Sequence, residues 1–242
     1  MPAETESLTT PYVAGARALG TVVVTGGASG LGAAVADAVA EAGGTPIVLD
    51  RQAPAAGHTW VEIDLADPRR AEDVVRQVAD EHGLDAVVTA AGTDACGDIL
   101  DVDADAWDRV VMVNLLGTAA VVRAALPYLE RSQGRIVTVA STLGWRALPA
   151  ATAYCASKFG VVGFTRALQA ELGGRVGVTL LLPGGMRTHF FDDRPEQFKP
   201  GAGQHLNDPA DVARSVLFAL QQPAGCEVRE LMVTPAGEPS WP

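Results

Sequence analysis

The chain has 242 residues, of which 48% are hydrophobic and 19% charged, and these values suit one sizeable domain with a packed core. A formal net charge of −11 repels nucleic acid and anionic membranes, and no apolar run approaches the roughly 20 residues of a membrane span. Three cysteines without a CxxC pair argue against a disulfide framework and a structural zinc site, so we expect a soluble, cytoplasmic protein.

The polar residues 1–17 predict a flexible leader ahead of a single domain over residues 18–242. The first ten residues carry two glutamates, no basic residue and no apolar segment, which is unlike a secretory signal. No stretch rich in Gly, Pro or Ser divides the rest of the chain, and no repeat of fixed period appears.

The first regular unit begins with the β-branched run 21–25, which is typical of a strand buried on both faces. A glycine-rich turn and an alanine-rich helical segment to residue 43 follow, and a second strand over 46–49 closes at Asp50. A strand, a glycine turn, a helix and a strand within about 30 residues have the length of a βαβ unit.

The alternation of strands and helices then continues to the end of the chain. We predict further strands over 59–63, 85–90, 134–140, 175–182 and 231–234. Helices are expected from Asp67-Pro68 to about residue 82, over 105–129, over 152–172, and from Asp208-Pro209 to about residue 221, since Asp-Pro supplies an N-cap and a first helical residue. Residues 186–207 are irregular. The predicted fold is α/β: a single-domain, Rossmann-type, doubly wound parallel sheet of six to seven strands with helices on both faces.

The glycine turn has the pattern G-x-x-x-G-x-G, formed by Gly26, Gly30 and Gly32. Glycines let the backbone approach a pyrophosphate, and the helix N-terminus offers free N–H groups, so we interpret this turn as a dinucleotide site. The alternative is a purely structural tight turn. Asp50 can accept hydrogen bonds from the adenosine ribose and repels a 2′-phosphate, which favours NAD over NADP. Arg51 is the counter-argument, because a guanidinium can bind that phosphate.

A second group of residues predicts acid–base chemistry. Ser141 ends the apolar run 135–140, Tyr154 follows thirteen residues later, and Lys158 lies four residues further on. Positions i and i+4 share one face of a helix, so the phenol and the ammonium can meet, and a nearby cation favours phenolate. Moving a tyrosine pKa from ~10 to ~7 takes roughly 4 kcal/mol, to which a bound cationic cofactor can add.

With Thr25-Gly26-(x3)-Gly30-Leu31-Gly32, Asn114, Ser141 and Tyr154-(x3)-Lys158 in order, the chain resembles the short-chain dehydrogenase/reductase family over residues 19–234. The resemblance implies that Tyr154 is the general acid/base and that Lys158 lowers its pKa and holds the nicotinamide ribose. It implies that Ser141 stabilises the developing alkoxide. Asn114 would hold its helix open around a water that relays protons to Lys158.

The resemblance also implies a set of cofactor contacts. Asp64 would contact the adenine, and the segment that begins Pro183-Gly184 would reach the carboxamide. The cofactor-binding positions expected in this way are Gly26, Ser29, Gly30, Leu31, Gly32, Asp50, Arg51, Asp64, Leu65, Ala90, Ala91, Gly92, Tyr154, Lys158, Pro183, Gly184, Met186 and Thr188. At Thr89-Ala90 the family's usual asparagines are missing, so we expect no side-chain hydrogen bond there. We expect no metal, since the four histidines lack ligand spacing.

These features predict an NAD(H)-dependent oxidoreductase that interconverts a secondary alcohol and a ketone. The alternatives are an NADP(H)-dependent 3-oxoacyl-thioester reductase and, in a different class, a non-catalytic dinucleotide-binding sensor or scaffold. The expected partners are a small-molecule substrate and copies of the chain, since the outer apolar positions of helices 105–129 and 152–172 predict a homodimer or homotetramer. Residues 143–153 and 186–207 should shape the pocket. Trp241, in the tail 238–242, is a candidate interface residue.

Overall fold

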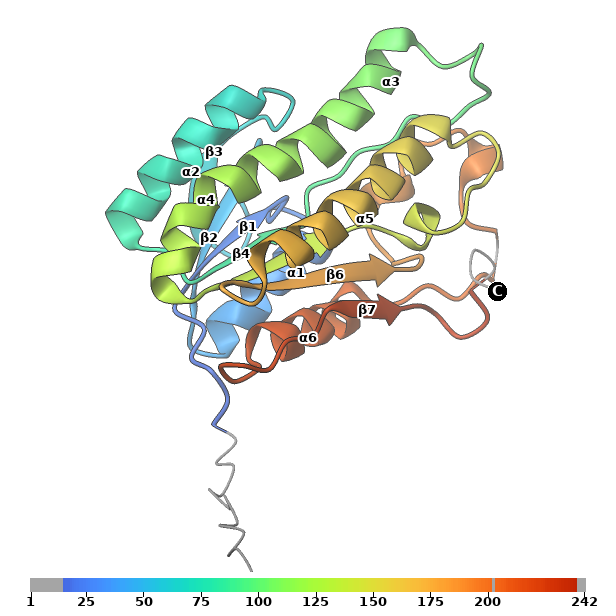
Figure 1. The fold of residues 1–242 in the computed structure, drawn as a ribbon. Helices are drawn as coiled ribbons and strands as arrows, with labels where there is room; N and C mark the ends of the chain where they lie inside the picture. The colour runs from blue at the N-terminus through green and yellow to red at the C-terminus, as the bar shows by residue number, and fades with distance from the viewer. Residues whose placement is uncertain (1–14, 202, 239–242) are drawn as a thin grey trace, which may run out of the picture.

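Seven parallel strands form one sheet in the order β3-β2-β1-β4-β5-β6-β7 (Figure 1). The computed structural model describes residues 15–201 and 203–238, so most of the predicted leader, and Trp241 with the end of the tail, lie outside the described residues. The predicted fold is confirmed. The strands are β1 Thr21–Thr25, β2 Thr45–Asp50, β3 Thr59–Glu62, β4 Ala86–Thr89, β5 Arg135–Val139, β6 Gly177–Pro183 and β7 Glu230–Val233.

The strand order places a crevice at the carboxyl ends of β1 and β4. The chain runs outward from β1 to β2 and β3 and then returns to place β4 on the other side of β1. In open parallel sheets ligands bind where the strand order reverses in this way. The strands next to this point are buried on both faces: β4, β5 and β6 throughout, and β1 from its second residue. This explains their unbroken apolar and β-branched runs.

Helices cover both faces of the sheet (Figure 1). Helices α1 Gly30–Glu41 and α6 Pro209–Leu220 pack together on one face, where their apolar side chains meet alternate residues of β1, β4 and β5. Helices α2 Pro68–His82, α4 Thr118–Ser132 and α5 Thr152–Leu172 cover the other face. The predicted N-caps are confirmed, since Asp67 accepts from the backbone N–H groups of Arg69 and Arg70 and Asp208 accepts from that of Ala210.

The long helix predicted over 105–129 is present as a continuous helical run over 104–132, but it contains a π-helical stretch that the sequence analysis did not predict. Helix α3 Ala104–Val111 passes into the π-helix η1 Met112–Gly117, which passes into α4. A π-helical turn holds one extra residue, and here it lets the buried Asn114 side chain leave the helix to bond the loop after β4. Residues 104–132 form the one helical run in the described ranges that is long and apolar enough to cross a membrane. Half of its most apolar window is buried in the fold, a property it shares with core helices.

The segment after β7 closes the carboxyl end of the sheet beside β6. The N–H of Gly184 donates to the carbonyl of Val233 at 2.9 Å, and the N–H of Gly185 donates to Oε2 of Glu238 at 3.0 Å. The sequence analysis assigned no role to residue 238. The structure places its carboxylate on the backbone that follows β6, at the rim of the crevice.

Candidate active site

A cleft of about 990 Å³ opens at the carboxyl ends of the strands, near the upper end of the range for small-molecule sites. Its wall includes Ser141 and every predicted cofactor-binding residue, whereas Asn114 does not line it. The walls come from the glycine turn, the ends of β2, β4 and β5, the start of α5, and the irregular segment after β6.

The glycine turn fits close against the end of β4. Gly26 has φ +70°, and a Cβ there would lie 2.7 Å from the Cα of Ala91. A Cβ on Gly32 would overlap the carbonyl oxygen of Gly26. The hydroxyl of Thr25 accepts a hydrogen bond from the N–H of Ala91 at 3.1 Å and joins the two strand ends. Only glycine therefore allows this approach of the first turn of α1 to the crevice.

The N-terminus of α1 suits an anionic group. The N-cap residue Ser29 makes no side-chain capping bond in the described structure, and the first turn of α1 has no acidic residue. The unpaired N–H groups of the first turn therefore remain available, with the positive end of the helix dipole, at the cleft. These features fit the diphosphate of a dinucleotide.

Asp50 lies at the end of β2, beside this turn. Its Oδ2 accepts from the N–H of Ala28 at 3.0 Å and its Oδ1 from the N–H of Gln52 at 3.1 Å. Both oxygens keep further acceptor capacity. The adjacent Arg51 is exposed at the same wall of the cleft. The predicted charge pattern is therefore present, with a carboxylate fixed to the turn and a guanidinium in solvent.

Asp64, expected near the adenine, is held by a residue that the sequence analysis missed. Arg109 of α3 donates to both carboxylate oxygens of Asp64, at 2.8 and 3.1 Å. Burial raises the pKa of Asp64, but the hydrogen bonds from Arg109 and from the N–H of Ala66 outweigh it and leave that pKa below its usual value. The carboxylate is thus ionised and oriented at the adenosine end of the cleft.

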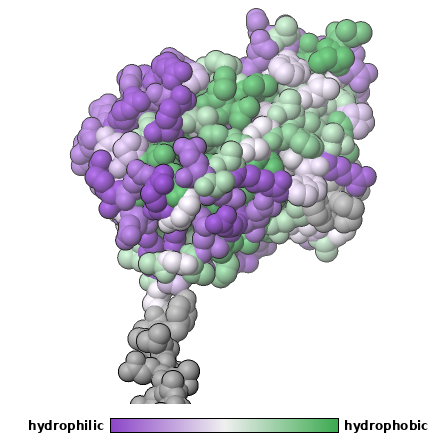
Figure 2. Space-filling view, in the orientation of Figure 1, coloured by the Kyte–Doolittle hydropathy of each residue, from purple (hydrophilic) through white to green (hydrophobic). Residues whose placement is uncertain are grey.

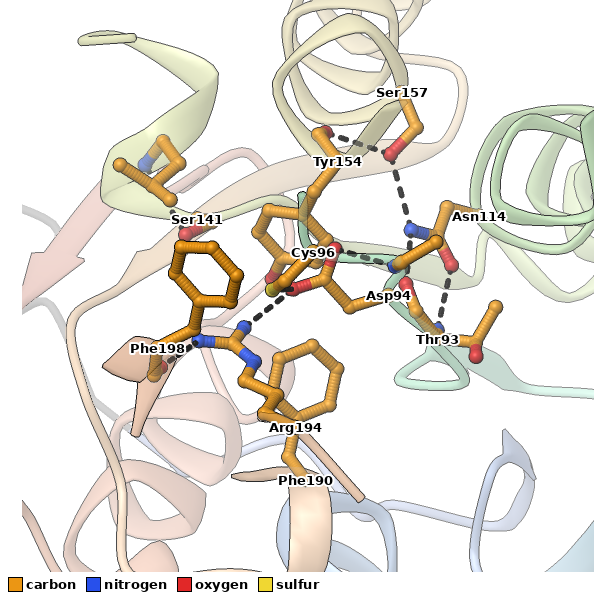
Figure 3. A network of polar contacts seen from close by, with 12 residues as sticks. Thr93, Asp94, Cys96, Asn114, Ser141, Tyr154, Ser157, Phe190, Arg194 and Phe198 are labelled. Carbon is orange, nitrogen blue, oxygen red and sulfur yellow. Dashed lines mark hydrogen bonds and ion pairs between the residues drawn. The ribbon is translucent and has the colours of Figure 1, made fainter. Parts of the chain in front are cut away.

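Ser141, Tyr154 and Lys158 come together as the spacing predicts (Figure 3 shows the first two). The Ser141 hydroxyl lies close enough to the Tyr154 phenol to lower its pKa, and Ser141 Oγ accepts from the N–H of Leu143 at 3.1 Å. The ammonium of Lys158 donates to the carbonyl of Val139 at 2.9 Å and lies 5.6 Å from the centroid of the Tyr154 ring. The end of β5 therefore positions the serine and the lysine against the phenol.

Asn114 joins the helix of Tyr154 to the loop after β4 (Figure 3). Its Oδ1 accepts from the N–H of Thr93 at 2.8 Å, and its Nδ2 donates to the Thr93 carbonyl at 2.9 Å and to Ser157 Oγ at 3.0 Å. Ser157 in turn donates to the carbonyl of Tyr154 at 2.8 Å. A Cβ on Gly92 would be 3.6 Å from Asn114 Oδ1 and 3.7 Å from Lys158 Nζ, so both side chains face the same spot.

The pKa values of the two central groups move in opposite directions, and burial is the main cause of both changes. Part of Tyr154 is exposed to the cleft, but desolvation of its phenol raises its pKa, and the hydrogen bond with Ser141 only partly offsets this. Burial lowers the pKa of Lys158 from 10.5 to about 8, with the charge of Asp94 opposing the change. The expected lowering of the Tyr154 pKa is therefore not produced by the protein's own groups alone.

Three side chains lie near Tyr154 at the cleft wall, and the sequence analysis did not single out two of them, Asp94 and Arg194. Asp94, two residues after Gly92, forms an ion pair with Arg194 of the irregular segment. Phe190 faces the cleft with its ring centroid 5.6 Å from that of Tyr154. Asp94 had the signal of an acid just after a cofactor-contacting glycine, whereas Arg194 lies in a stretch without periodicity.

Two further expectations have simple outcomes. Trp145 belongs to the segment 143–153 that was expected to shape the pocket, but it does not line the cleft. The centroid of its ring lies 4.5 Å from the guanidinium carbon of Arg166. Thr89 Oγ1 is buried and has no hydrogen-bond partner in the described part of the chain, in line with the missing asparagine. Among the same residues, no group of three or more His, Cys, Asp or Glu side chains is arranged to hold a metal ion.

Comparisons with known proteins agree with this geometry. The family described as short chain dehydrogenase matches residues 20–198. The chain is 32% identical over 226 residues to an uncharacterized oxidoreductase of Staphylococcus aureus strain MW2, covering 88% of this chain and 96% of the relative. The fold matches a ligand-free aldohexose dehydrogenase from Thermoplasma acidophilum with a TM-score of 0.82 at 24% identity, covering 91% and 95% of the two chains. An alcohol dehydrogenase from Thermococcus sibiricus in complex with 5-hydroxy-NADP has a TM-score of 0.77 at 24% identity, covering 88% and 95%.

The buried lysine predicts a particular dependence of stability on pH. Because the pKa of Lys158 is lowered to about 8, the folded chain binds fewer protons than the unfolded chain between pH 8 and 10.5, so stability rises with pH in that window. Relative to Lys158→Met, the wild type should gain about 2 kcal/mol of unfolding free energy from pH 8 to 9.5, and nothing below pH 7. Urea unfolding at a series of pH values measures this.

The control for this experiment is Lys199→Met, at a partly exposed lysine paired with Glu196. Its stability should follow that of the wild type at each pH. If the unfolding free energies of Lys158→Met and the wild type change in parallel with pH, burial does not lower the pKa of this lysine.

Proposed function

The chain belongs to the short-chain dehydrogenase family, and on this premise we propose that it interconverts a secondary alcohol and a ketone with NAD(H). It is an oxidoreductase of that family. The observation that carries the finer proposal is that Ser141, Tyr154 and Lys158 meet at the wall of the cleft that the glycine turn enters. In this proposal Tyr154 is the general acid/base.

The proton steps follow from the positions of these side chains. A substrate hydroxyl placed against Ser141 and Tyr154 gives its proton to the phenolate as the carbonyl forms, and takes it back in the reverse direction. Ser141 donates a hydrogen bond to the same oxygen as negative charge develops on it. The nicotinamide ring, when bound, supplies the hydride acceptor or donor and, in its oxidised form, a positive charge near the phenol.

Lys158 completes the proton path in this proposal. Its ammonium is anchored on the carbonyl of Val139 and faces the space at Gly92 that Asn114 also faces. Because burial brings its pKa to about 8, it can hold or release a proton near neutral pH. Its charge disfavours the neutral phenol, in the direction that the reaction in the oxidative sense needs.

NAD is the preferred cofactor in this proposal because of Asp50. Its carboxylate is tied to the glycine turn through Ala28, so it cannot move away without disturbing that turn. A 2′-phosphate at the adenosine ribose would face this charge. The exposed Arg51 is the observation that favours the second candidate, an NADP(H)-dependent reductase of 3-oxoacyl thioesters.

A non-catalytic sensor or scaffold is disfavoured by the same contacts. Binding of a dinucleotide needs the glycine turn and the ends of β1, β2 and β4. It does not need Tyr154, Ser141 and a buried lysine to meet at the far end of the cleft.

We also propose the cytoplasm as the compartment, on the cysteine pattern of the sequence.

We propose that copies of the chain associate through the face formed by η1, α4 and α5. Hydrophobic surface gathers there (Figure 2), including Leu116 of η1 at 42% exposure and Phe159 of α5 at 45%. Burial of such a face is favourable by about 25 cal/mol per Å² of apolar surface. A homodimer or homotetramer would cover these side chains.

Tyr154→Phe removes the phenol and keeps the ring that contacts Phe190. Turnover of secondary alcohols should fall by about 10²- to 10⁴-fold, while the Kd for NAD, measured by fluorescence or calorimetry, stays nearly unchanged. Tyr128→Phe is the matched control, since that phenol bonds Asp80 on the surface. Full activity of Tyr154→Phe would show that Tyr154 is not the general base.

Asp50→Asn keeps the shape and an acceptor for Ala28 but removes the charge. The ratio of kcat/KM for NAD to that for NADP should fall by at least about tenfold, because a like-charge contact costs more than about 1.4 kcal/mol. Asp73→Asn, at an exposed acid on α2, should leave the ratio unchanged. A wild-type chain that already prefers NADP would contradict the assignment of Asp50.

Phe159→Glu places a charge on the proposed association face. Sedimentation velocity should show an oligomer for the wild type and a smaller species for this variant. Leu100→Glu, at a leucine that is 94% exposed and lies outside η1, α4 and α5, should keep the wild-type state. A monomeric wild type at micromolar concentration would refute the interface.

A further inference from the structure

A buried ion pair joins two distant segments on the substrate side of Tyr154 (Figure 3). Asp94 follows β4, and Arg194 belongs to the irregular segment after β6, 100 residues later. The side chain of Asp94 is 5% exposed and that of Arg194 is 17% exposed. Burial of two charged groups is costly, so a pair at this place needs a reason beyond closing a loop.

Both carboxylate oxygens of Asp94 accept hydrogen bonds from the protein itself. Its Oδ1 accepts from the N–H of Ala95 at 2.8 Å, and its Oδ2 accepts from the thiol of Cys96 at 3.0 Å and from Nη2 of Arg194. Burial and the neighbouring carboxylate raise the pKa of Cys96 to about 12, so the thiol stays a donor. Asp94 therefore orients Arg194 through Oδ2, which accepts two of its three recorded hydrogen bonds.

Arg194, in contrast, has donors to spare. A guanidinium carries five N–H groups, and the recorded acceptors are Asp94 Oδ2 and the carbonyl of Phe198, the latter at 3.4 Å. Its Nε is buried and has no partner in the described residues, one of only three such side-chain atoms there. Nε itself has almost no accessible surface, so the spare donors that a ligand could meet are the remaining N–H groups of the two Nη atoms, on a side chain that is 17% exposed at the cleft wall.

The aromatic residues around Arg194 hold it beside the reacting atoms. Its guanidinium carbon lies 5.0 Å from the centroid of the Phe190 ring and 4.6 Å from that of Phe191. The same Phe190 ring contacts Tyr154, so one phenylalanine separates the guanidinium from the catalytic phenol. Contacts of this kind limit the motion of the arginine, and little freedom is lost when it binds a ligand.

Positive charge is present near Tyr154 even though the whole chain is strongly acidic. Asp94 and Arg194 neutralise each other, and the ammonium of Lys158 lies 5.6 Å from the centroid of the Tyr154 ring, while Asp193, Lys199 and Glu238 also line the cleft. A cationic substrate group would meet the guanidinium instead of a free carboxylate. A carboxylate can accept charge-assisted hydrogen bonds from the unpaired N–H groups.

We propose that Arg194 binds the carboxylate of the substrate, and that the chain therefore acts on hydroxy acids and the matching oxo acids. This inference rests on the proposed function, with the hydroxyl placed at Ser141 and Tyr154. Asp94 is the positioning residue that holds the guanidinium. The simpler alternative is that the pair only latches the irregular segment over the cleft, and the experiment separates the two.

The probes are sets of 2-, 3- and 4-hydroxy acids of three to eight carbons, each with its methyl ester and the parent secondary alcohol, and one quaternary ammonium alcohol. Wild type and Arg194→Gln are assayed with NAD and NADP. Wild type should prefer at least one acid over its ester, and Arg194→Gln should reduce kcat/KM for that acid by about 10- to 100-fold, mainly through KM. Esters should change by less than about threefold. Arg187→Gln, in the same segment and paired with Asp208, is the matched control.

Asp94→Asn gives a second test with opposite charge effect. It removes the neutralising carboxylate and leaves the guanidinium, so kcat/KM for acids should not fall below that for esters. Equal losses for acids, esters and alcohols in Arg194→Gln would show that the pair is a latch only. A wild type that prefers esters, thioesters or the quaternary ammonium alcohol would also overturn the inference.

Failure of this inference can be told apart from failure of the proposed function. If neutral alcohols are oxidised in a Tyr154-dependent way without preference for acids, only the role of Arg194 is wrong. If no alcohol or ketone reacts with either cofactor, the proposed function is wrong. Calorimetric titration of the same acids into wild type and Arg194→Gln, with cofactor present, then tests Arg194 alone, and absence of any Arg194-dependent binding overturns it.

Discussion

The hydrogen bonds of Asn114 are the contact on which the geometry of the site depends. One buried amide ties the loop after β4, the π-helix η1 and helix α5 together, through Thr93 and Ser157. Ser157 passes the constraint to the backbone of Tyr154. Loss of a partner for a buried amide costs roughly 1 to 3 kcal/mol, so these segments hold their relative positions as a unit. The π-helical geometry of η1 is what brings this amide out of the regular helix.

The site also shows why a bound cofactor matters for the proton chemistry. Burial raises the pKa of Tyr154 and lowers that of Lys158, so in the protein alone both groups are pushed toward their neutral forms. Low polarity around the pair makes any added charge more effective than it would be in water. A cation beside the phenol would therefore lower its pKa more strongly here than at an exposed site. Burial thus has two effects on Tyr154: it raises the pKa of the phenol, and it increases the effect that a nearby cation has in lowering that pKa.

Local signals in the sequence were enough to predict most of the fold and the reacting triad. Asp67-Pro68 and Asp208-Pro209 mark helix starts through contacts within three residues, and α5 has the predicted bounds of 152 and 172. The π-helix was missed because it depends on a bond from Asn114 to Thr93, 21 residues away. The pairing of Asp94 with Arg194 was missed for the same reason. No period or spacing connects an acid after one strand with an arginine in an irregular segment.

The part of the site that could be predicted lies on regular elements, and the part that was missed lies largely on the irregular segment after β6. The residues of the proposed proton path come from the ends of β4 and β5 and from α5, where regular elements with dense packing hold each side chain to one position. The substrate side is built from residues 186–200, which contain only the short turns His189–Phe191 and Glu196–Phe198. Such a segment can change its side chains without disturbing the sheet. The buried ion pair and the aromatic contacts attach this segment beside Tyr154, while a backbone bridge to Asn207 and the ion pair of Arg187 with Asp208 attach its start. In the proposed function these contacts, more than the residues of the proton path, would select the substrate.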